Sequence, residues 1–381
     1  MKTDGFIDSD PRRDLARQWV ASQMPGLGRQ GWWPNLDSLR PASSDASFRR
    51  YFRIDGQAPH EGDSTRQDAR EATSLILMDA PPDREDIRPF IKVAEIFLSA
   101  GLQVPKIIAA NPELGFLLCT DLGQQTYLQR LAENTGLDDD HQHKTRTELY
   151  REAWRSLVKL QTYGDRSGLP DYDTTKLTQE MQLFDQWFLG HHRPIVLSAS
   201  EKDQLATVYR LICDRCTAQP QVIVHRDYHS RNLMICPLHG PGVLDFQDAV
   251  IGPISYDLVS LLRDAYIEWP EELQIDWAIG YWQDARQAGL PIAQDFADFW
   301  KDFEWMGLQR HIKVLGIFAR LYHRDGKENY LNDLPVVSLC VMPSLLHAAI
   351  RDLGRWQKFS SAAHEWHRDH HPRHDSRSRT G

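Results

Sequence analysis

The 381-residue sequence contains no run of eighteen apolar residues, and its first residues, MKTDGFIDSDPRRD, include acids and no apolar core. The first absence argues against a membrane-spanning helix, and the second against a secretory signal. Basic residues are also in the minority, since 44 Lys and Arg face 53 Asp and Glu, for a net charge of −9. Because nucleic-acid affinity depends on clustered Lys and Arg, we expect small-molecule partners rather than nucleic acid or membrane. We therefore expect a monomeric, cytoplasmic protein.

Cysteine is scarce and odd in number, with five residues, of which only Cys213 and Cys216 form a CxxC pair. No second CxxC or nearby His pair completes a zinc site, and the surrounding apolar residues have helical spacing. We therefore expect ordinary core cysteines in a reducing compartment. The C-terminal stretch SAAHEWHRDHHPRHDSRSRTG holds five His but lacks apolar periodicity, which favours a solvated, disordered tail over 361–381 rather than a metal site.

Short β-forming runs alternate with helical patterns in the first part of the chain. An opening amphipathic helix is predicted after Asp10-Pro11, with Leu15 and Trp19 on one face. A helical apolar pattern begins at Ile87, with Asp83 as a candidate cap, and is ended by Gly101. The β-forming runs are 47–54, 73–80, 104–110 and 115–120. These patterns predict an N-terminal lobe over 1–120, a small antiparallel sheet with one helix packed on it.

Long amphipathic helical patterns dominate beyond Gly123, and short β runs interrupt them only at VIV, LMI and VLDF. The pattern LQRHIKVLGIFARL is predicted to be a packing helix, although its polar residues Gln309, Arg310 and His311 can alternatively reach a cleft. We expect an α+β fold whose second lobe, over 121–360, is larger and mainly helical. The predicted helices lie near 148–161, 177–190, 200–217, 256–267, 272–288 and 294–322.

Polar residues stand beside the short β runs between residues 222 and 248. The chain reads VIVHRDYHSRNLMI and then VLDFQD, which places Asp227, Asn232 and Asp245 at the ends of successive runs. Mg²⁺ prefers hard oxygen ligands, so an Asn carbonyl and an Asp carboxylate can hold it between phosphate oxygens. A separate Asp can accept the proton of an attacking hydroxyl. The set predicts metal-assisted phosphoryl transfer.

This order of residues resembles the catalytic core of the protein-kinase fold, HRDxxxxN followed by DFG. It is more similar to the aminoglycoside phosphotransferase and choline kinase branch, in which a His follows two residues after the catalytic Asp, as His229 does here. The resemblance extends from about Ser43 to His323 and implies a protein-kinase-like bilobal fold that uses ATP and Mg²⁺. It implies Asp227 as the catalytic base, with Asn232 and Asp245 as the metal ligands.

The resemblance also assigns candidate roles outside the metal site. The backbone of Thr120, Asp121 and Leu122 resembles the hinge that receives adenine. Asp257, in the stretch IGPISYDL, matches a further Asp of the branch. It is a candidate for substrate contact together with His229, and bracing of the catalytic loop by hydrogen bonds is an equal alternative.

The chain departs from the kinase pattern at the phosphate end of the site. The strand LILMDA has no Lys, the stretch SSDASFRR stands in place of a Gly-rich loop, and Lys92 and Lys106 are the only lysines between residues 3 and 120. A turn of small residues can still offer its amides to phosphate, and nearby arginines can supply charge. A solvated edge strand explains these arginines equally well. The candidate nucleotide contacts are Ser44, Ser47, Arg49 and Arg50.

Within the branch, the segments SSDASFRRYFRI, LILMDAPPDREDIRPF and GFLLCTDLG are most similar to bacterial kinases that act in cell-wall recycling. These kinases phosphorylate the anomeric hydroxyl of N-acetylmuramate and N-acetylglucosamine, which implies an N-acetylated amino sugar as the partner of ATP. Arg263 would suit the lactyl carboxylate of muramic acid, although a surface ion pair explains it equally well.

Three other functions can be compared with this one. The acceptor can be a different small hydroxylated molecule, such as an aminoglycoside, choline or a fructosamine. A protein kinase needs an activation segment, yet only eleven residues separate Asp245 from Asp257 and no APE triplet follows. A non-catalytic nucleotide-binding scaffold would fit the missing Lys, but such a scaffold has no use for the Asp, Asn and Asp set.

Overall fold

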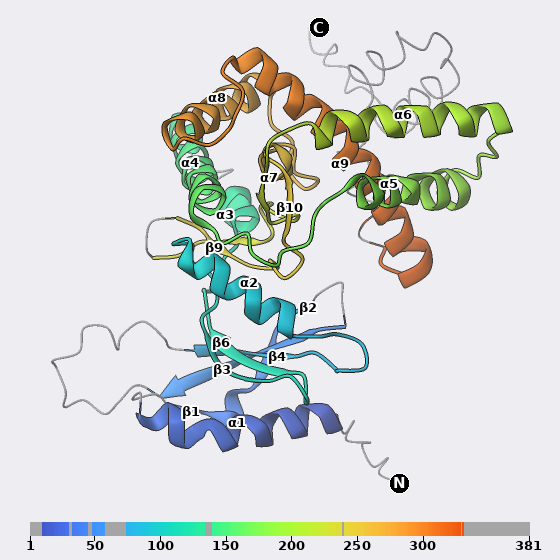
Figure 1. The fold of residues 1–381 in the computed structure, drawn as a ribbon. Coiled ribbons are helices and arrows are strands. Elements are labelled where there is room, and N and C mark those ends of the chain that lie inside the picture. The colour runs from blue at the N-terminus through green and yellow to red at the C-terminus, as the bar shows by residue number, and fades with distance from the viewer. Residues whose placement is uncertain are drawn as a thin grey trace, which may run out of the picture. The chain divides into compact units, whose positions relative to one another are not determined.

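The computed structural model describes residues 10–29, 33–44, 48–57, 74–133, 139–237, 240–328 and 330. Figure 1 shows the chain coloured along its length. It divides into two compact units: the first runs to Gln125 and adds Met234–Asp248, and the second takes Thr126–Leu233 and the described chain from Ala249. No helix in the described ranges combines the length and apolarity that crossing a bilayer needs. The predicted tail over 361–381 lies outside the described residues, as does Ser47.

The sheet of the first unit is antiparallel throughout, as the alternating runs predict (Figure 1). Its strand order is β1-β3-β4-β6-β5, with β2 paired to β3, and a 3-10 turn η1 (Leu36–Ser38) joins β1 to β2. Because successive side chains of a strand point to opposite faces, the sheet has two apolar faces to cover. The strands are β1 (Trp33–Pro34), β2 (Arg40–Ser44), β3 (Arg50–Gln57), β4 (Ser74–Asp79), β5 (Ile107–Asn111) and β6 (Phe116–Thr120).

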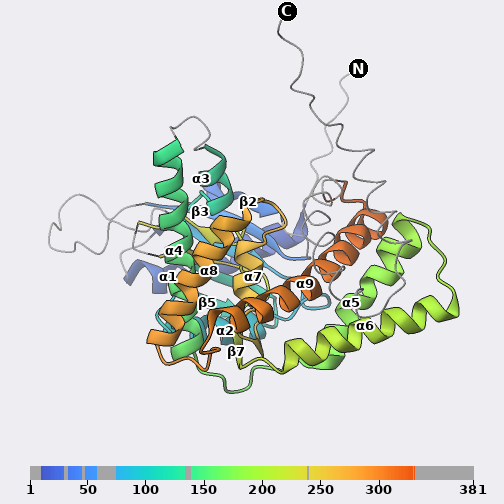
Figure 2. The same cartoon turned by 90° about the horizontal axis from the view of Figure 1, so that it is seen from above.

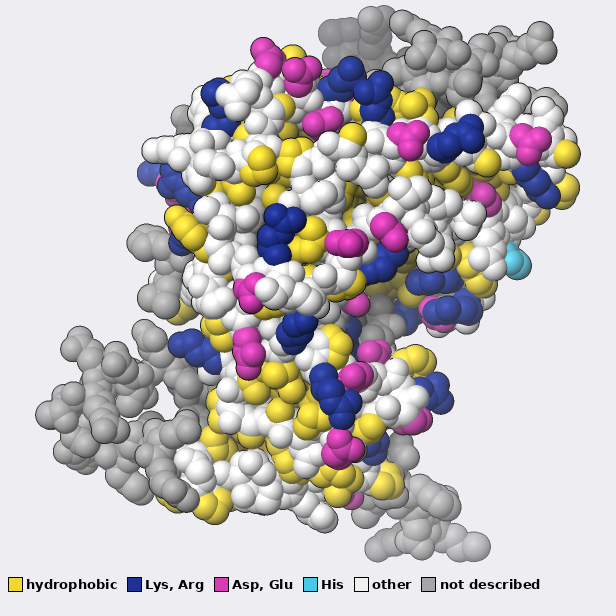
Figure 3. Space-filling view, in the orientation of Figure 1, with side chains coloured by type: hydrophobic (Ala, Val, Ile, Leu, Met, Phe, Trp, Pro, Cys, Tyr) yellow, Lys and Arg dark blue, Asp and Glu magenta, His cyan; other side chains and the backbone are white. Residues whose placement is uncertain are grey.

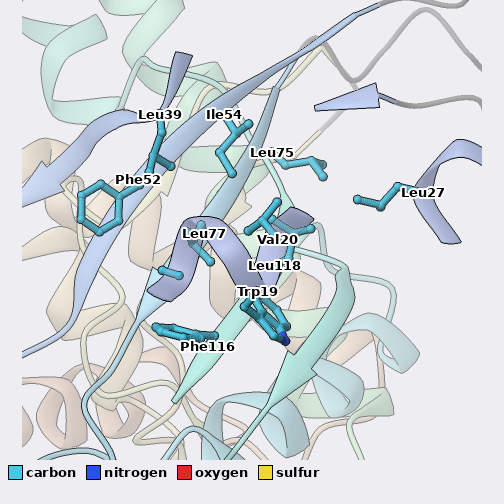
Figure 4. Close-up of a cluster of buried hydrophobic side chains, with 11 residues drawn as sticks. Trp19, Val20, Leu27, Leu39, Phe52, Ile54, Leu75, Leu77, Phe116 and Leu118 are labelled. Carbon is cyan, nitrogen blue, oxygen red and sulfur yellow. The ribbon is translucent and has the colours of Figure 1, made fainter. Parts of the chain in front are cut away.

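Helix α1 (Pro11–Arg29) covers one face, and Figure 4 shows its buried residues against the sheet. Asp10 caps the helix, since its Oδ1 accepts a hydrogen bond of 3.1 Å from the Arg13 amide. The helix is longer than predicted because it continues through Pro25. Leu15 was expected to share the buried face of Trp19 but is 39 % exposed. It lies about 100° around the helix from buried Ala16, at the edge of the apolar face.

Helix α2 (Arg88–Ser99) lies on the opposite side of the sheet from α1 (Figure 1). Its Phe90 and Phe97 rings lie 4.6 and 5.5 Å from the ring of Phe246, which follows the two-stranded ladder of β8 (Leu233–Met234) and β9 (Gly242–Val243). The prediction that Asp83 caps this helix is wrong. The Arg88 amide bonds to Asp86 Oδ1 at 3.0 Å instead, because that carboxylate lies nearer the first turn.

The second unit is mainly helical, as predicted, and its helix α9 lies alongside α5 and α6 in both Figures 1 and 2. Strands β7 (Gln221–Val224) and β10 (Val250–Pro253) pair antiparallel within it. The pattern predicted at 177–190 is an α-helix that continues into the π-helix η4 (Phe184–His192), a rare geometry. The other helices are α3 (Tyr127–Glu133), α4 (Asp139–Tyr163), α5 (Thr174–Leu183), α6 (Ala199–Thr217), α7 (Tyr256–Leu262), α8 (Glu271–Gln287) and α9 (Phe296–Asp325).

Charges of both signs are mixed on the face shown in Figure 3, where Lys and Arg side chains stand among Asp and Glu. Such a surface does not build the single-sign field that a phosphate backbone requires. The expectation of small-molecule partners stays a prediction.

Candidate active site

The loop from His225 to Asn232 leaves β7 through a strained peptide. Arg226 has φ +78°, the left-handed region that a non-glycine residue seldom adopts. Asp257, the second residue of α7, is fully buried and accepts the amides of His225 at 2.6 Å and Arg226 at 3.0 Å. Asp257 was considered for substrate contact and for bracing of the catalytic loop, and these two bonds match the bracing role.

Asp227 and Asn232 stand at the two ends of one turn. Asn232 Nδ2 donates to the Asp227 carbonyl at 2.9 Å, and its amide donates to the His229 carbonyl at 2.9 Å. With the nitrogen engaged, the Asn232 carbonyl oxygen is left as an acceptor that no described residue donates to. A hard, unoccupied carbonyl oxygen fits the donor set of a Mg²⁺ ligand.

The electrostatic surroundings of Asp227 favour its charged form. Burial by itself raises the pKa of Asp227, but Lys313 and Arg310, followed by His229 and Arg226, lower that pKa to about 2. No residue in the described part of the chain donates a hydrogen bond to its carboxylate. The carboxylate is therefore ionised, and its oxygens can accept a hydroxyl proton.

Of the residues that supply this positive charge, Lys313 and Arg226 received no role from the sequence, and Arg310 was considered only as a residue that can reach a cleft. Glu180 of α5 accepts a hydrogen bond from Arg226 Nη2, and the same Oε1 atom lies 3.2 Å from Lys313 Nζ. Tyr172 donates to the other oxygen of Glu180. Burial opposes ionisation of Glu180, but Lys313 and Arg226 lower its pKa. The stretch LQRHIKVLG places Arg310 and Lys313 in a predicted packing helix, but the sequence does not show which residues they contact.

His229 and Arg263, the other two candidate acceptor contacts, differ in their surroundings. The His229 ring meets Tyr266 edge-on at 5.4 Å, and its buried Nδ1 has no partner among the described residues. Burial lowers the pKa of His229. Arg263 bonds to Glu304 and to Gln274 (3.2 Å), with its side chain only 9 % exposed. The ion pair considered for Arg263 is therefore present, and it is buried rather than on the surface.

Asp245 lies in the first unit, where Phe246 joins it to the core. It too has a left-handed backbone, with φ +60°, and its Oδ1 accepts from Gln247 Nε2 at 2.9 Å. Arg49 Nη2 lies 3.5 Å from the same oxygen. The carboxylate is a hard ligand of the kind Mg²⁺ prefers, and its chemistry fits the proposed role.

Arg49, which precedes β3, and the β3 arginines Arg50 and Arg53 bond to different partners. Arg50 bonds to buried Asp79 and to Asp10, each at 2.5 Å. Arg53 bonds to Asp121 at 2.5 Å. Ser44 ends β2 opposite Arg50. Of the candidate phosphate contacts that the structure describes, Arg49 is the one beside a predicted metal ligand.

The predicted hinge begins at Thr120, the last residue of β6. The Thr120 amide donates to the Lys106 carbonyl at 3.0 Å, and the Leu122 carbonyl accepts from Cys236 Sγ at 3.6 Å. The Asp121 carboxylate accepts from Arg53 and also from the Gly123 amide at 2.9 Å. Burial opposes ionisation, but the Arg53 bond lowers the pKa of Asp121. The side chain of Asp121 therefore stabilises this turn.

A family model described as the phosphotransferase enzyme family matches residues 38–296. The chain belongs to this phosphotransferase family. The match begins at the last residue of η1 and covers β2 to β6, the catalytic loop and the helices through α8, so the predicted phosphotransferase activity is confirmed.

Similar curated proteins extend the match over most of the chain. This phosphotransferase is 41 % identical over 331 residues to the N-acetylmuramate/N-acetylglucosamine kinase of Pseudomonas putida, covering 86 % of this chain and 90 % of that protein. It is 44 % identical over 304 residues to the kinase of the same name from Neisseria meningitidis, covering 80 % and 84 %.

Solved structures support the fold. An ADP-bound aminoglycoside phosphotransferase matches with a TM-score of 0.54 at 15 % identity, covering 86 % of this chain and 97 % of that one. Plasmodium vivax ethanolamine kinase matches with a TM-score of 0.54 at 12 % identity, covering 92 % and 98 %. The predicted kinase-like α+β fold, with an antiparallel sheet first and helices after it, is thereby confirmed.

Proposed function

We propose that this phosphotransferase transfers the γ-phosphate of ATP to the anomeric hydroxyl of N-acetylmuramate or N-acetylglucosamine, as a step of peptidoglycan recycling. The similarity to kinases named for these two sugars, at 41–44 % identity over most of both chains, carries the proposal. We place the enzyme in the cytoplasm as a monomer.

Asp227 is the proposed catalytic base. A carboxylate with so low a pKa is a weak proton acceptor, so it suits a hydroxyl that is more acidic than a simple alcohol, as an anomeric hydroxyl is. In a loose transition state the proton leaves late, and the first task of the base is to orient the attacking oxygen. An ionised carboxylate without a protein donor is well suited to accept that hydrogen bond.

Asn232 and Asp245 are the proposed Mg²⁺ ligands. Both offer hard oxygens, and the Asn232 amide nitrogen is already bound to the Asp227 carbonyl, which fixes which end of the amide is the ligand. When bound, the ion would neutralise charge on the phosphate oxygens of ATP.

The remaining nucleotide contacts are proposed from their places in the first unit. The backbone of Thr120 to Leu122 would receive adenine, and the backbone amides near Ser44 and Ser47 would bind phosphate. Arg49, which lies 3.5 Å from Asp245, is the better candidate for the charge of the missing Lys. Arg50 is held by two carboxylates and has a structural role instead.

The proposal is tested by following ADP release with ATP, Mg²⁺ and a panel of acceptors. We expect turnover with N-acetylmuramate and N-acetylglucosamine, and none with their methyl glycosides, in which the anomeric oxygen is blocked. Turnover with only an aminoglycoside, choline or a fructosamine would show that the acceptor is that compound and not an N-acetylated amino sugar. Binding of an ATP analogue without turnover on any acceptor would favour a nucleotide-binding scaffold.

A further inference from the structure

Helix α9 carries two cations inside the second unit. Arg310 and Lys313 are one turn apart, and each residue is 4 % exposed. Both converge on the Tyr256 hydroxyl, which lies 3.4 Å from Arg310 Nη1 and 2.9 Å from Lys313 Nζ. Burying a cation is costly unless it is paired and hydrogen-bonded, so such a pair needs an account.

Arg310 bonds to the peptide that directs Asp227. Its Nη1 donates to the Arg226 carbonyl at 3.1 Å, and that carbonyl belongs to the peptide bond between Arg226 and Asp227. The preceding amide of Arg226 is held by Asp257. A left-handed, non-glycine residue persists only where its surroundings hold it, and here bonds act on both its N–H and its C=O.

Lys313 completes the charge balance around this peptide. Glu180 is a single carboxylate shared by Lys313 and Arg226, while Arg310 has no carboxylate partner within hydrogen-bonding distance in the described chain. Asp227 and Asp264 are nearby carboxylates whose charge favours this third cation. The pair therefore supports Asp227 through the peptide and through space, without taking up its oxygens.

We propose that Arg310 and Lys313 are positioning residues for Asp227, with Arg310 fixing the Arg226 carbonyl and Lys313 supporting Arg310 through Tyr256. The inference rests on the proposed function, because it takes Asp227 as the residue that orients the acceptor. It gives α9 a part in the reaction that does not require contact with either substrate.

The test compares Arg310→Met and Lys313→Met with Glu304→Gln. The Glu304 variant breaks another buried ion pair of α9, with Arg263, and serves as the matched control. We expect Arg310→Met to lower kcat by about 100-fold with the KM for ATP unchanged, since a small displacement of a catalytic group has an effect of this size. Lys313→Met should lower kcat in the same sense. Glu304→Gln should lower Tm while keeping kcat, with N-acetylglucosamine as the acceptor in every assay, because this sugar lacks the lactyl carboxylate for which Arg263 was considered.

A second measurement separates positioning from folding. Free guanidinium ion should restore part of the kcat of Arg310→Ala, because it can occupy the vacated space and bond to the Arg226 carbonyl. Wild-type kcat in Arg310→Met would overturn the inference. So would a loss of kcat in Glu304→Gln equal to that in Arg310→Met, if guanidinium also fails to restore the kcat of Arg310→Ala. Wild-type enzyme inactive on every acceptor would overturn the proposed function, and this inference with it.

Discussion

Asp227 and the cations around it set the chemistry at the scale of single residues. We predict that Asp227→Asn keeps the fold and binds an ATP analogue but loses about 10²- to 10⁴-fold in kcat, the usual contribution of a positioned acid or base. The substitution keeps the volume and removes the charge, so Tm should also fall, since Lys313, Arg310 and Arg226 then lose a nearby negative charge. Steady-state kinetics and thermal unfolding measure both effects. Near-wild-type turnover would remove Asp227 from its role.

The two proposed metal ligands should differ in how they respond to metal. We expect Asp245→Ala to abolish activity at every Mg²⁺ concentration, because it removes a negative ligand. Asn232→Ala should be partly rescued by more Mg²⁺, because a neutral oxygen contributes less affinity. Titration of kcat against Mg²⁺ distinguishes them, and an equal, unrescued loss in both variants would contradict this ranking.

Arg49 and Arg50 are sequence neighbours with different partners, which makes each a control for the other. Arg49→Ala is expected to raise the KM for ATP or lower kcat, because it removes the charge beside Asp245. Arg50→Ala should chiefly lower Tm, since breaking its bond leaves the fully buried Asp79 with Arg12 as its remaining cation. If neither variant changes ATP kinetics, the phosphate is held by turn amides alone.

The catalytic motif was readable from the sequence because its residues are close together along the chain and belong to types with few alternative uses. The supporting cations were not, since Glu180 is 46 residues from Arg226 and Lys313 is 57 residues from Tyr256. The burial of Arg263 could not be predicted for the same reason. A charged residue is expected to be exposed unless its partner, here Glu304 on another helix, is known.

Burial of a histidine on helix α9 affects how the stability of the protein depends on pH. His311 is 3 % exposed, and burial together with Arg263 and Arg310 lowers its pKa from 6.5 to about 3. The folded state thus binds its proton less readily than the unfolded state. Stability from this residue is complete above pH 6.5 and is lost as the pH falls from there toward 3, by up to about 1.4 kcal/mol per pH unit.

We predict that His311→Gln reduces this acid sensitivity. Urea unfolding at pH 7.5 and at pH 5, in wild type and variant, measures it, because the variant should lose less unfolding free energy between the two conditions even if it is less stable at both. Equal losses in wild type and variant would show that other groups cause the acid sensitivity.

Regular elements followed from apolar periodicity, and the exceptions have local causes. Strands β3 to β6 and most long helices match because their buried faces repeat along the chain. Strands β1, β2 and β10 were not predicted, since each is too short or too rich in Pro, Gly and polar residues to show a repeat. The length of α1 was underestimated, since Pro25 reads as a helix end but is accommodated here. The π-helix η4 was missed because a pattern of period 3.6 does not reveal an extra residue per turn.

At the scale of the whole molecule, the catalytic motif contributes to both compact units. Asp227 and Asn232 belong to the second unit, whereas Asp245 lies in Met234–Asp248, which packs with the first. Sequence alone suggested a division near residue 120. Met234–Asp248 belongs to the first unit because of contacts between residues far apart in the sequence, such as Phe246 with Phe90 and Gln103 with Gly242. Composition along the chain does not show such contacts.

The central claim is the transfer of phosphate to an anomeric oxygen. The most direct measurement is proton and phosphorus NMR of the product formed from ATP and N-acetylglucosamine or N-acetylmuramate by the full-length enzyme. We predict a sugar 1-phosphate, seen as an anomeric proton coupled to phosphorus. Phosphate on carbon 6, with an anomeric proton that shows no phosphorus coupling, would contradict the account.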